Sequence, residues 1–470
     1  MIITIWLGTK MTNREISEVS PNENKPPFNP TYLSAGNESQ YTIDLEMNNQ
    51  GIFHIDTKVT IRNTSSDNWN EVVFYFIPNM FTKENSYLDT PSIVDIVNVK
   101  VNGTSTSFTL EKDTLTIPLT TVLQPKNEVN IEVQYSFSLP EYGRRFTKSG
   151  DNYYLAQWYP MVATYRNGNW NKEEYLLYGE SYHTSFSDFN FNYQIPKAYQ
   201  IVTTSEEDLH PSENSGSLKS SNVKEFFVSI LKEPTVTEGE VDGINVRVFD
   251  VGKYEKHKEE ILQIAMNALQ YFQQHIGKYP YRQLDILLDE IAMEYPGIVT
   301  VGKMGSGKNR GDFINIEKLK AVVVHEIAHQ WFYSVISNDP FYDGWLDESF
   351  AELLTALFFA DLENKEYAPT DIILPNGENY LSSLTLPVNL PLNQYPVNGN
   401  SPYHYNKPLH YLWSIFEEYG GREKFNEFLK VYYQTYQYKE LNTEEFTRFL
   451  SHFLDLENNN LFKGWILLEK

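Results

Sequence analysis

Along residues 41–250 the hydrophobic positions recur at every second residue. Over residues 129–139 apolar side chains alternate with polar ones, and residues 55–61 repeat the pattern. This alternation is typical of strands that bury one face, and turn-forming pairs such as Asn102-Gly103 separate the runs. The pattern predicts an all-β region of about 200 residues, folded as a twisted sandwich or saddle. Inside it, residues 208–223 are polar and are predicted to form one exposed loop.

Beyond residue 250 the hydrophobic period lengthens to that of an α-helix. The apolar positions between Ile261 and Phe272 fall on one helical face, and Gly277 with Pro280 ends that helix. A strand is predicted next, at 285–290. The further helices predicted from the pattern cover about 317–336, 345–362, 408–418 and 422–456, the last with a capping box made by Asn442 and Glu445. The second region is therefore expected to be mainly helical.

The N-terminal residues differ from both regions. Residues 1–8 are apolar but short, and the polar stretch that follows to residue 37 is typical of a flexible tether. Two interpretations stay open, an irregular N-terminus or the remnant of an export signal. Export is slightly favoured, which would place the protein outside the cell or in the cell envelope rather than in the cytoplasm. The predicted segments are 1–37 (tether or signal remnant), 38–250 (β domain) and 251–470 (helical domain).

The amino-acid composition excludes several classes of function. The chain of 470 residues has 38 basic and 62 acidic side chains, a formal net charge of −24. Such an acidic surface repels phosphate backbones, which argues against nucleic-acid partners. The chain has no cysteine, so disulfides, iron–sulfur clusters and thiolate metal sites are excluded, and a transition metal would need His, Asp or Glu ligands. No run of 18 apolar residues occurs, so no transmembrane span is predicted.

One short motif has the spacing of metal ligands. His325-Glu326-Ile327-Ala328-His329 is an HExxH sequence. On a helix, positions i and i+4 share a face one turn apart, so both imidazoles can bind one zinc ion while Glu326 points at a metal-bound water. Catalytic zinc takes three protein ligands and keeps one open position. Glu348 supplies the third, because it follows His329 after 18 intervening residues and begins the helix predicted at 345–362.

The sequence around these ligands resembles a known family. HEIAHQWF, eighteen intervening residues and WLDESFAE are similar to the gluzincin metallopeptidases of the aminopeptidase N and leukotriene hydrolase kind. The resemblance implies one zinc ion per chain, held by His325, His329 and Glu348. It also implies that Glu326 is the general base that deprotonates the zinc-bound water. Glu352 and Asp347 both remain open as acceptors for the outer ring nitrogens of the histidines.

Three further segments fit the resemblance. Residues 291–295 (IAMEY) occupy the place of the family's G-A-M-E-N segment, which implies that Glu294 binds the free α-amine of the substrate. Isoleucine and tyrosine replace the glycine and the asparagine of that pattern. Residues 405–408 (YNKP) resemble Y-x-K-G, which implies that Tyr405 donates a hydrogen bond to the oxyanion. In QWYP, Gln157 is the candidate for the Gln or Glu that the family's β domain places near the amine.

The resemblance covers roughly residues 40–460. It implies an N-terminal all-β saddle or sandwich followed by a mainly α, thermolysin-like zinc catalytic domain. Family members usually add a large C-terminal helical domain that roofs the active site, whereas this chain stops at Lys470. We therefore expect either a short form with an open cleft or a partner or oligomer that covers it.

The function expected from these observations is that of a zinc aminopeptidase that removes N-terminal residues from peptides. Two alternatives remain, a zinc endopeptidase of broad specificity with an open cleft and an inactive, peptide-binding relative. Metal analysis separates the enzymes from the binding protein. Substrates with free and blocked N-termini separate the two enzymes.

Overall fold

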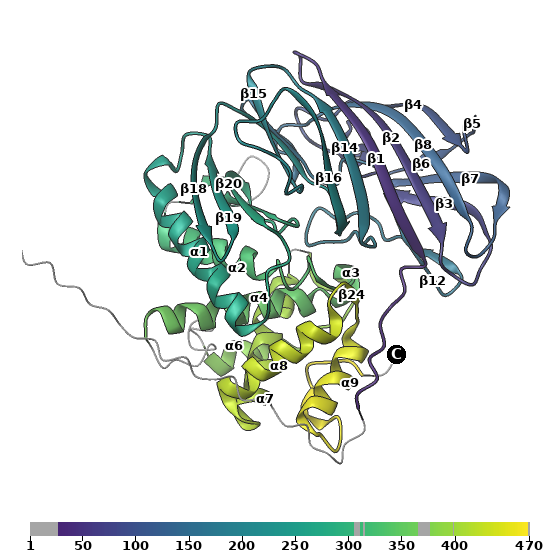
Figure 1. Cartoon of the computed structure of the whole chain (residues 1–470). Helices are drawn as coiled ribbons and strands as arrows, with labels where there is room; N and C mark the ends of the chain where they lie inside the picture. Colours follow the sequence, from purple (N-terminus) through teal and green to yellow (C-terminus); the bar gives the residue numbers. More distant parts are fainter. Residues whose placement is uncertain (1–26, 305–310, 314, 365–376, 398, 469–470) are drawn as a thin grey trace, which may run out of the picture.

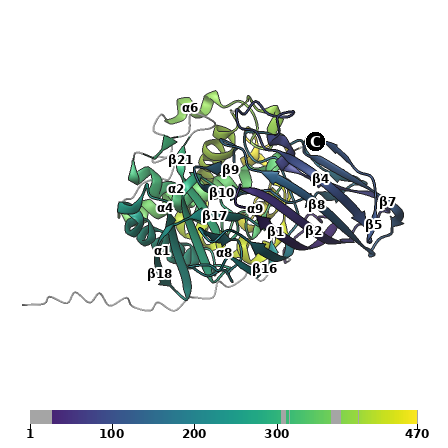
Figure 2. The ribbon, with the colours of Figure 1, turned by 90° about the horizontal axis from the view of Figure 1, so that it is seen from above.

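The computed structural model describes residues 27–304, 311–313, 315–364, 377–397 and 399–468. Figure 1 shows two halves side by side, a β-rich half in purple and blue and a mainly helical half in green and yellow. We call residues 37–232 the β half and residues 235–468 the helical half. Seen from above, the strands of the β half extend to one side of the helices (Figure 2). This order confirms the predicted fold class, an all-β domain followed by a mainly α domain.

A seven-stranded sheet dominates the β half. Its strand order is β16-β14-β1-β2-β8-β4-β5, and β1 and β14 are the parallel pair among antiparallel neighbours. Along β8 buried side chains alternate with partly exposed ones, as the period of two predicts. The strands are β1 (Asn37–Met47), β2 (Ile52–Asn63), β4 (Val94–Val101), β5 (Thr104–Ser105), β8 (Glu128–Ser138), β14 (Ser187–Gln194) and β16 (Ser215–Val223).

Three smaller sheets complete the β half, with strand orders β11-β3-β7-β6, β15-β17-β10-β9 and β12-β13. The buried face of the large sheet packs on them, for example where the ring of Phe53 on β2 meets that of Tyr153 on β10. The strands are β3 (Trp69–Tyr75), β6 (Thr109–Glu111), β7 (Thr114–Leu123), β9 (Phe146–Ser149), β10 (Asn152–Leu155), β11 (Met161–Val162), β12 (Thr164–Arg166), β13 (Asn169–Asn171), β15 (Tyr199–Thr203) and β17 (Val228–Lys232).

The prediction of an exposed loop at residues 208–223 is wrong for the second part of that range. Residues 215–223 form β16, which pairs with β14 at the edge of the seven-stranded sheet. Its side chains are mostly exposed, and only Leu218 and Val223 are buried. An edge strand with this little buried surface gives almost no hydrophobic period, so its sequence resembles that of a loop.

A five-stranded sheet of order β18-β19-β20-β21-β22 begins the helical half, with β19, β20 and β21 parallel. Helix α1 contacts β18 and β19, and α2 contacts β21 and α4. The strands are β18 (Thr235–Val241), β19 (Ile244–Asp250), β20 (Gln283–Ile291), β21 (Ile298–Met304), β22 (Gly311–Asp312), β23 (Ile336–Ser337) and β24 (Lys439–Glu440). The helices are α1 (Lys258–His275), α2 (Ile316–Ala328), α3 (Pro340–Asp343), α4 (Trp345–Leu362), α6 (Gly377–Ser383), α7 (Lys407–Glu418), α8 (Gly421–Tyr436) and α9 (Thr443–Leu454).

The helix predicted at 422–456 is two helices. Between α8 and α9, β24 pairs in parallel with β23. Asn442 caps α9 as predicted, because its side chain accepts a hydrogen bond from the backbone N–H of Glu445 at 3.0 Å. The Glu445 side chain does not complete a capping box; it accepts hydrogen bonds from Tyr436, Arg448 and Thr31 instead.

Residues 27–36 connect the two halves. Of the tether predicted at 1–37, residues 1–26 lie outside the described residues. Thr31 donates to both carboxylate oxygens of Glu445, from its backbone N–H at 2.8 Å and its hydroxyl at 2.7 Å, and the Leu33 N–H donates to the Glu440 carbonyl at 2.8 Å. The segment therefore lies along α9 before it enters β1, as the purple trace in Figure 1 shows. We call residues 27–36 the strap.

Among the described residues, no helix combines the length and the apolar character needed to cross a membrane.

Candidate metal centre and active site

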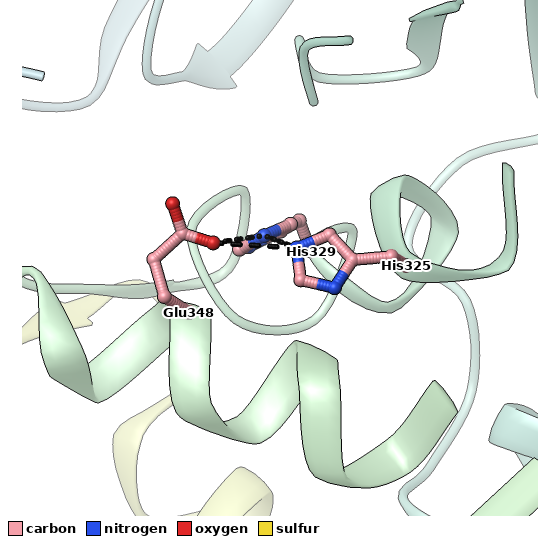
Figure 3. Close-up of side chains that lie close together, drawn as sticks. All are labelled: His325, His329 and Glu348. Carbon is pink, nitrogen blue, oxygen red and sulfur yellow. Dashed lines mark hydrogen bonds and ion pairs between the residues drawn. The ribbon is translucent and has the colours of Figure 1, made fainter. Parts of the chain in front are cut away.

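The two histidines of the HExxH motif lie at the C-terminal end of α2. Asn315 caps this helix by accepting from the N–H groups of Glu317 and Lys318. Leu319, Val323 and Ile327 are fully buried, which holds one side of the helix against the core. Glu348 lies in the first turn of the next long helix, α4. The close-up in Figure 3 shows its carboxylate pointing at both imidazoles.

Three candidate ligand atoms form a nearly equilateral triangle. His325 Nε2 lies 3.1 Å from His329 Nε2, and Glu348 Oε2 lies 3.3 Å from the former and 3.2 Å from the latter. A tetrahedral zinc ion with bonds of about 2.0–2.1 Å separates its ligand atoms by about 3.3 Å. The side chains therefore fit one zinc ion without rearrangement, and among the described residues they form a group suited to hold a metal.

Outer partners orient both imidazoles. His329 Nδ1 donates to the Phe332 carbonyl, 2.9 Å away, which leaves Nε2 available to bind a metal. His325 Nδ1 lies 2.9 Å from Glu352 Oε2, so the structure selects Glu352 rather than Asp347 as its partner. Asp347 instead accepts from the backbone N–H of Glu348 at 2.9 Å.

The charges in the site favour a cation. Although burial opposes it, Glu294 and Glu348 raise the pKa of His329 to about 10, and Glu348 and Glu352 raise the pKa of His325 well above its usual value. Despite burial, the two histidines hold the pKa of Glu348 far below the usual range. The negative charges of the surrounding carboxylates would therefore stabilise a metal cation bound between the two imidazoles.

Two more acids predicted from the sequence are buried beside the triangle. Burial raises the pKa of Glu326, the residue between the two ligands, and raises that of Glu294 to about 8. Glu294 lies in the turn between β20 and β21. Gln330 fixes this turn, because its side chain donates to the Tyr295 carbonyl at 3.0 Å and accepts from the Gly297 N–H at 2.9 Å. Tyr295 stacks on Phe227 of the β half with ring centroids 4.0 Å apart, so the residue that departs from the family pattern fills the core.

Tyr405 contacts the triangle from a separate segment of the chain. It lies in a π-helical turn, Pro402–Asn406, that leads directly into α7. Its hydroxyl donates to Glu348 Oε1, and its ring lies against the His325 imidazole with centroids 5.8 Å apart. Lys407, two residues later, anchors the turn by donating to the Leu386 and Gly464 carbonyls at 2.7 and 3.2 Å.

Gln157 belongs to a buried network of the β half. Its amide nitrogen donates to Glu225 at 2.7 Å and to the Tyr182 hydroxyl at 2.9 Å, while its amide oxygen has no hydrogen-bond partner among the described residues. Its backbone has a φ of 49°, a left-handed conformation that few non-glycine residues adopt. Tyr333 of the helical half also donates to Glu225, which links this network to the chain that follows the histidines.

Sequence reasoning missed an ion pair next to the site. Glu180 and Arg145 lie 2.6 Å apart, and each side chain is only 10% exposed. Burial and the charge of Glu294 raise the pKa of Glu180 to about 8. The preceding residue, Gly179, has a φ of 65°, a backbone conformation that residues with a side chain rarely adopt. No motif marks either member of the pair, because two separate loops of the β half bring them together.

Known proteins resemble this chain in sequence. Residues 260–465 match the model of the peptidase family M1 domain. The chain is 26% identical over 217 residues to leukotriene A-4 hydrolase of Xenopus laevis, covering 42% of this chain and 34% of that protein. It is 22% identical over 448 residues to leucine aminopeptidase 2 of Candida albicans, covering 86% and 66%.

The fold comparison extends over almost the whole chain. A mutant of an M1 zinc metallopeptidase from Deinococcus radiodurans superposes with a TM-score of 0.64 at 14% identity, covering 92% of this chain and 94% of that one. At this identity the likeness concerns the fold alone. The matched parts of the two curated relatives above span one third to about two thirds of their lengths.

Proposed function

We propose, from the premise that residues 260–465 are a peptidase family M1 domain, that this chain is a zinc aminopeptidase that hydrolyses the N-terminal residue from peptides. That membership agrees with the resemblance given by the motifs. The observation that carries the proposal is the triangle of His325, His329 and Glu348, with Glu294 buried beside it. Relatives named as aminopeptidases and as a leukotriene hydrolase support the same reaction class.

The residues around the triangle divide the chemistry of peptide hydrolysis. When zinc is bound, it lowers the pKa of water and polarises the substrate carbonyl. Glu326 accepts the proton of the attacking water and passes it to the leaving amine. The hydroxyl of Tyr405 donates a hydrogen bond to the oxygen of the former carbonyl as negative charge develops there. A fixed donor at this position stabilises the transition state more than the bound substrate.

A second group of residues would recognise the free N-terminus. Glu294 faces the substrate ammonium. Glu180 is a second buried acid, and it interacts electrostatically with Glu294. The amide oxygen of Gln157 is a further acceptor, because Glu225 and Tyr182 hold the amide nitrogen and leave the oxygen available. A blocked N-terminus would bring no ammonium group to the buried carboxylate of Glu294, so a free terminus is required for efficient cleavage.

Hydrolysis of leucyl-p-nitroanilide and of its N-acetylated form tests the proposal. The zinc-loaded chain should cleave the free form, lose the activity with a chelator and regain it with zinc. Cleavage of both forms at equal rates would refute the aminopeptidase function and favour the endopeptidase. Stoichiometric zinc without hydrolysis of either form, or of longer peptides, would favour a binding protein.

A further inference from the structure

Glu225 is a carboxylate buried in the β half. It lies in the loop between β16 and β17 and is only 1% exposed. Its Oε1 atom accepts hydrogen bonds from the hydroxyls of Tyr182, at 3.0 Å, and Tyr333, and its Oε2 atom accepts one from the side chain of Gln157 at 2.7 Å. All three donors are neutral, and burial raises the pKa of Glu225 despite them. A buried acid with a perturbed pKa is typical of a functional site.

The charge of Glu225 decides which way the amide of Gln157 points. The amide has a donor end, Nε2, and an acceptor end, Oε1, whereas a carboxylate only accepts hydrogen bonds. Nε2 also donates to the Tyr182 hydroxyl at 2.9 Å, and that hydroxyl donates its own proton to Glu225. An amide turned over would place its oxygen against the oxygen of the carboxylate. The nitrogen therefore faces Glu225, and the oxygen faces away from it.

The oxygen of Gln157 is buried in the region of the proposed amine site. Among the described residues it has no hydrogen-bond partner, and a buried acceptor is destabilising until a donor reaches it. Ala156, which precedes Gln157, belongs to the same buried apolar cluster as Met293 and Tyr295, the two neighbours of Glu294. The segments that carry Gln157 and Glu294 therefore pack together, and a substrate ammonium bound by Glu294 is a suitable donor for this oxygen.

We propose that Glu225 is a positioning residue for the N-terminus of the substrate, because it holds the amide of Gln157 with the oxygen toward the ammonium. This inference rests on the aminopeptidase function proposed above and extends it to a residue that does not touch the substrate. Tyr333 adds a link to the metal site, since it follows His329 by four residues and donates to the same carboxylate. Glu225 therefore connects the amine acceptor of the β half to the chain that carries the metal ligands.

The test measures the binding of two ligands to the zinc-loaded full chain by isothermal titration calorimetry. Leucine hydroxamate has the free α-amine, and 4-methylpentanehydroxamate has the same skeleton without it. Both bind zinc through the hydroxamate group, so the ratio of their Kd values isolates recognition of the ammonium. The wild type should bind leucine hydroxamate more tightly than the analogue.

Glu225→Gln should reverse the orientation of the Gln157 amide. The new amide keeps its oxygen on the two tyrosine hydroxyls and presents its NH₂ group where Oε2 lies, so the oxygen of Gln157 turns to accept from it. Gln157 then directs its own NH₂ group at the ammonium. The Kd of leucine hydroxamate should rise about 10- to 100-fold, the range for a hydrogen bond to a charged group, while the analogue binds as before. For leucyl-p-nitroanilide KM should rise more than kcat falls, because the ammonium is bound in both the ground state and the transition state.

A double variant, Gln157→Glu with Glu225→Gln, exchanges the acid and the amide. The amide at position 225 donates to one oxygen of the new carboxylate, whose other oxygen faces the ammonium. This variant should therefore bind leucine hydroxamate at least as tightly as the wild type, which a merely structural role of Glu225 does not predict. Glu38→Gln is the matched control, because Glu38 is 67% exposed on the β half; it should leave both Kd values unchanged. Zinc content and thermal unfolding show whether each variant has folded.

The outcomes separate this inference from the proposed function. A wild type that prefers leucine hydroxamate to its analogue but does not hydrolyse leucyl-p-nitroanilide would overturn the proposed function alone. Equal Kd values for the two ligands in the wild type would overturn both. Unchanged binding by a folded Glu225→Gln variant, or an equal loss for both ligands, would overturn only the inference. If Glu225→Gln does not fold, the double variant decides, because weak binding of leucine hydroxamate by the folded double variant would also overturn the inference.

Discussion

Replacing Glu440 with glutamine should weaken the junction between the two halves. This carboxylate, on β24 of the helical half, accepts from Arg166 on β12 and lies 2.8 Å from the Nε2 atom of His183. Lys224 of the β half lies close by and donates to Ser337 on β23 at 2.8 Å. Despite burial, the charges of His183, Arg166 and Lys224 hold the pKa of Glu440 at about 2, below its usual value of 4.5.

The pKa difference gives the magnitude and the sign. From 4.5 to about 2 is 2.5 pKa units, or about 3 kcal/mol at roughly 1.4 kcal/mol for each unit. Because the folded-state pKa is the lower one, the unfolded chain binds more protons between pH 2 and pH 4.5. The stabilisation is therefore complete above pH 4.5 and is lost as the pH falls toward 2.

Urea unfolding followed by tryptophan fluorescence measures this effect. At pH 7 the free energy of unfolding of Glu440→Gln should be about 3 kcal/mol below that of the wild type, and the gap should narrow below pH 4.5. Glu38→Gln is the matched control, because Glu38 is 67% exposed and pairs with Arg62 on the surface; its effect should stay within about 0.5 kcal/mol. A gap that does not change with pH, or that equals the control, would refute the reasoning.

The remaining predictions concern the active site. Glu348→Ala should lose zinc and activity together, measured by metal analysis and leucyl-p-nitroanilide hydrolysis; stoichiometric zinc in this variant would remove Glu348 from the ligand set. Glu326→Gln should keep its zinc and lose about 10²–10⁴ in kcat, and a near-normal kcat in a folded variant would exclude it as the base. Tyr405→Phe should lower kcat by about 10²–10³ with little change in KM, whereas a rise in KM alone would make Tyr405 a ground-state contact. Glu294→Ala should erase most of the discrimination between free and acetylated substrates, a preference worth about 2–5 kcal/mol, with zinc content intact; persistence of that preference would assign amine recognition to other residues.

The parts of the site that the sequence predicts are those held by one stretch of backbone. His325 and His329 are one helical turn apart, so their spacing alone brings their side chains together. Glu348 follows because the next long helix begins close by in the sequence. In contrast, Arg145 and Glu180 come from separate loops of the β half, and only the assembled sheets place them beside Glu294.

Element boundaries fail where tertiary contacts decide them. The helix predicted at 317–336 ends at Ala328, because the chain turns sharply there and Tyr333 adopts a φ of 122° before β23. Residues 437–441, which connect α8 to α9, contain no glycine or proline that would mark the end of a helix. The strand β24 forms within them because β23 lies alongside. The spacing of hydrophobic residues indicates which face of one helix or strand is buried. It contains no information about a strand or helix that lies alongside but is distant in sequence.

The strap has a consequence for biosynthesis. A ribosome makes proteins from the N-terminus onward, so residues 27–36 emerge early, whereas Glu440, Glu445 and Phe449, which they contact, are made more than 400 residues later. Contacts at such separation form late, since the intervening chain must first be available and ordered. The β half can assemble its large sheet once β16 has been made, and β12 of the same half binds the end of the strap at Ser34 and Ala35. The first part of the strap, which contacts β24 and α9, must wait for them. During translation the aromatic side chain of Phe28 is therefore exposed to other chains until α9 has been made. A chaperone would protect the nascent protein most during this interval.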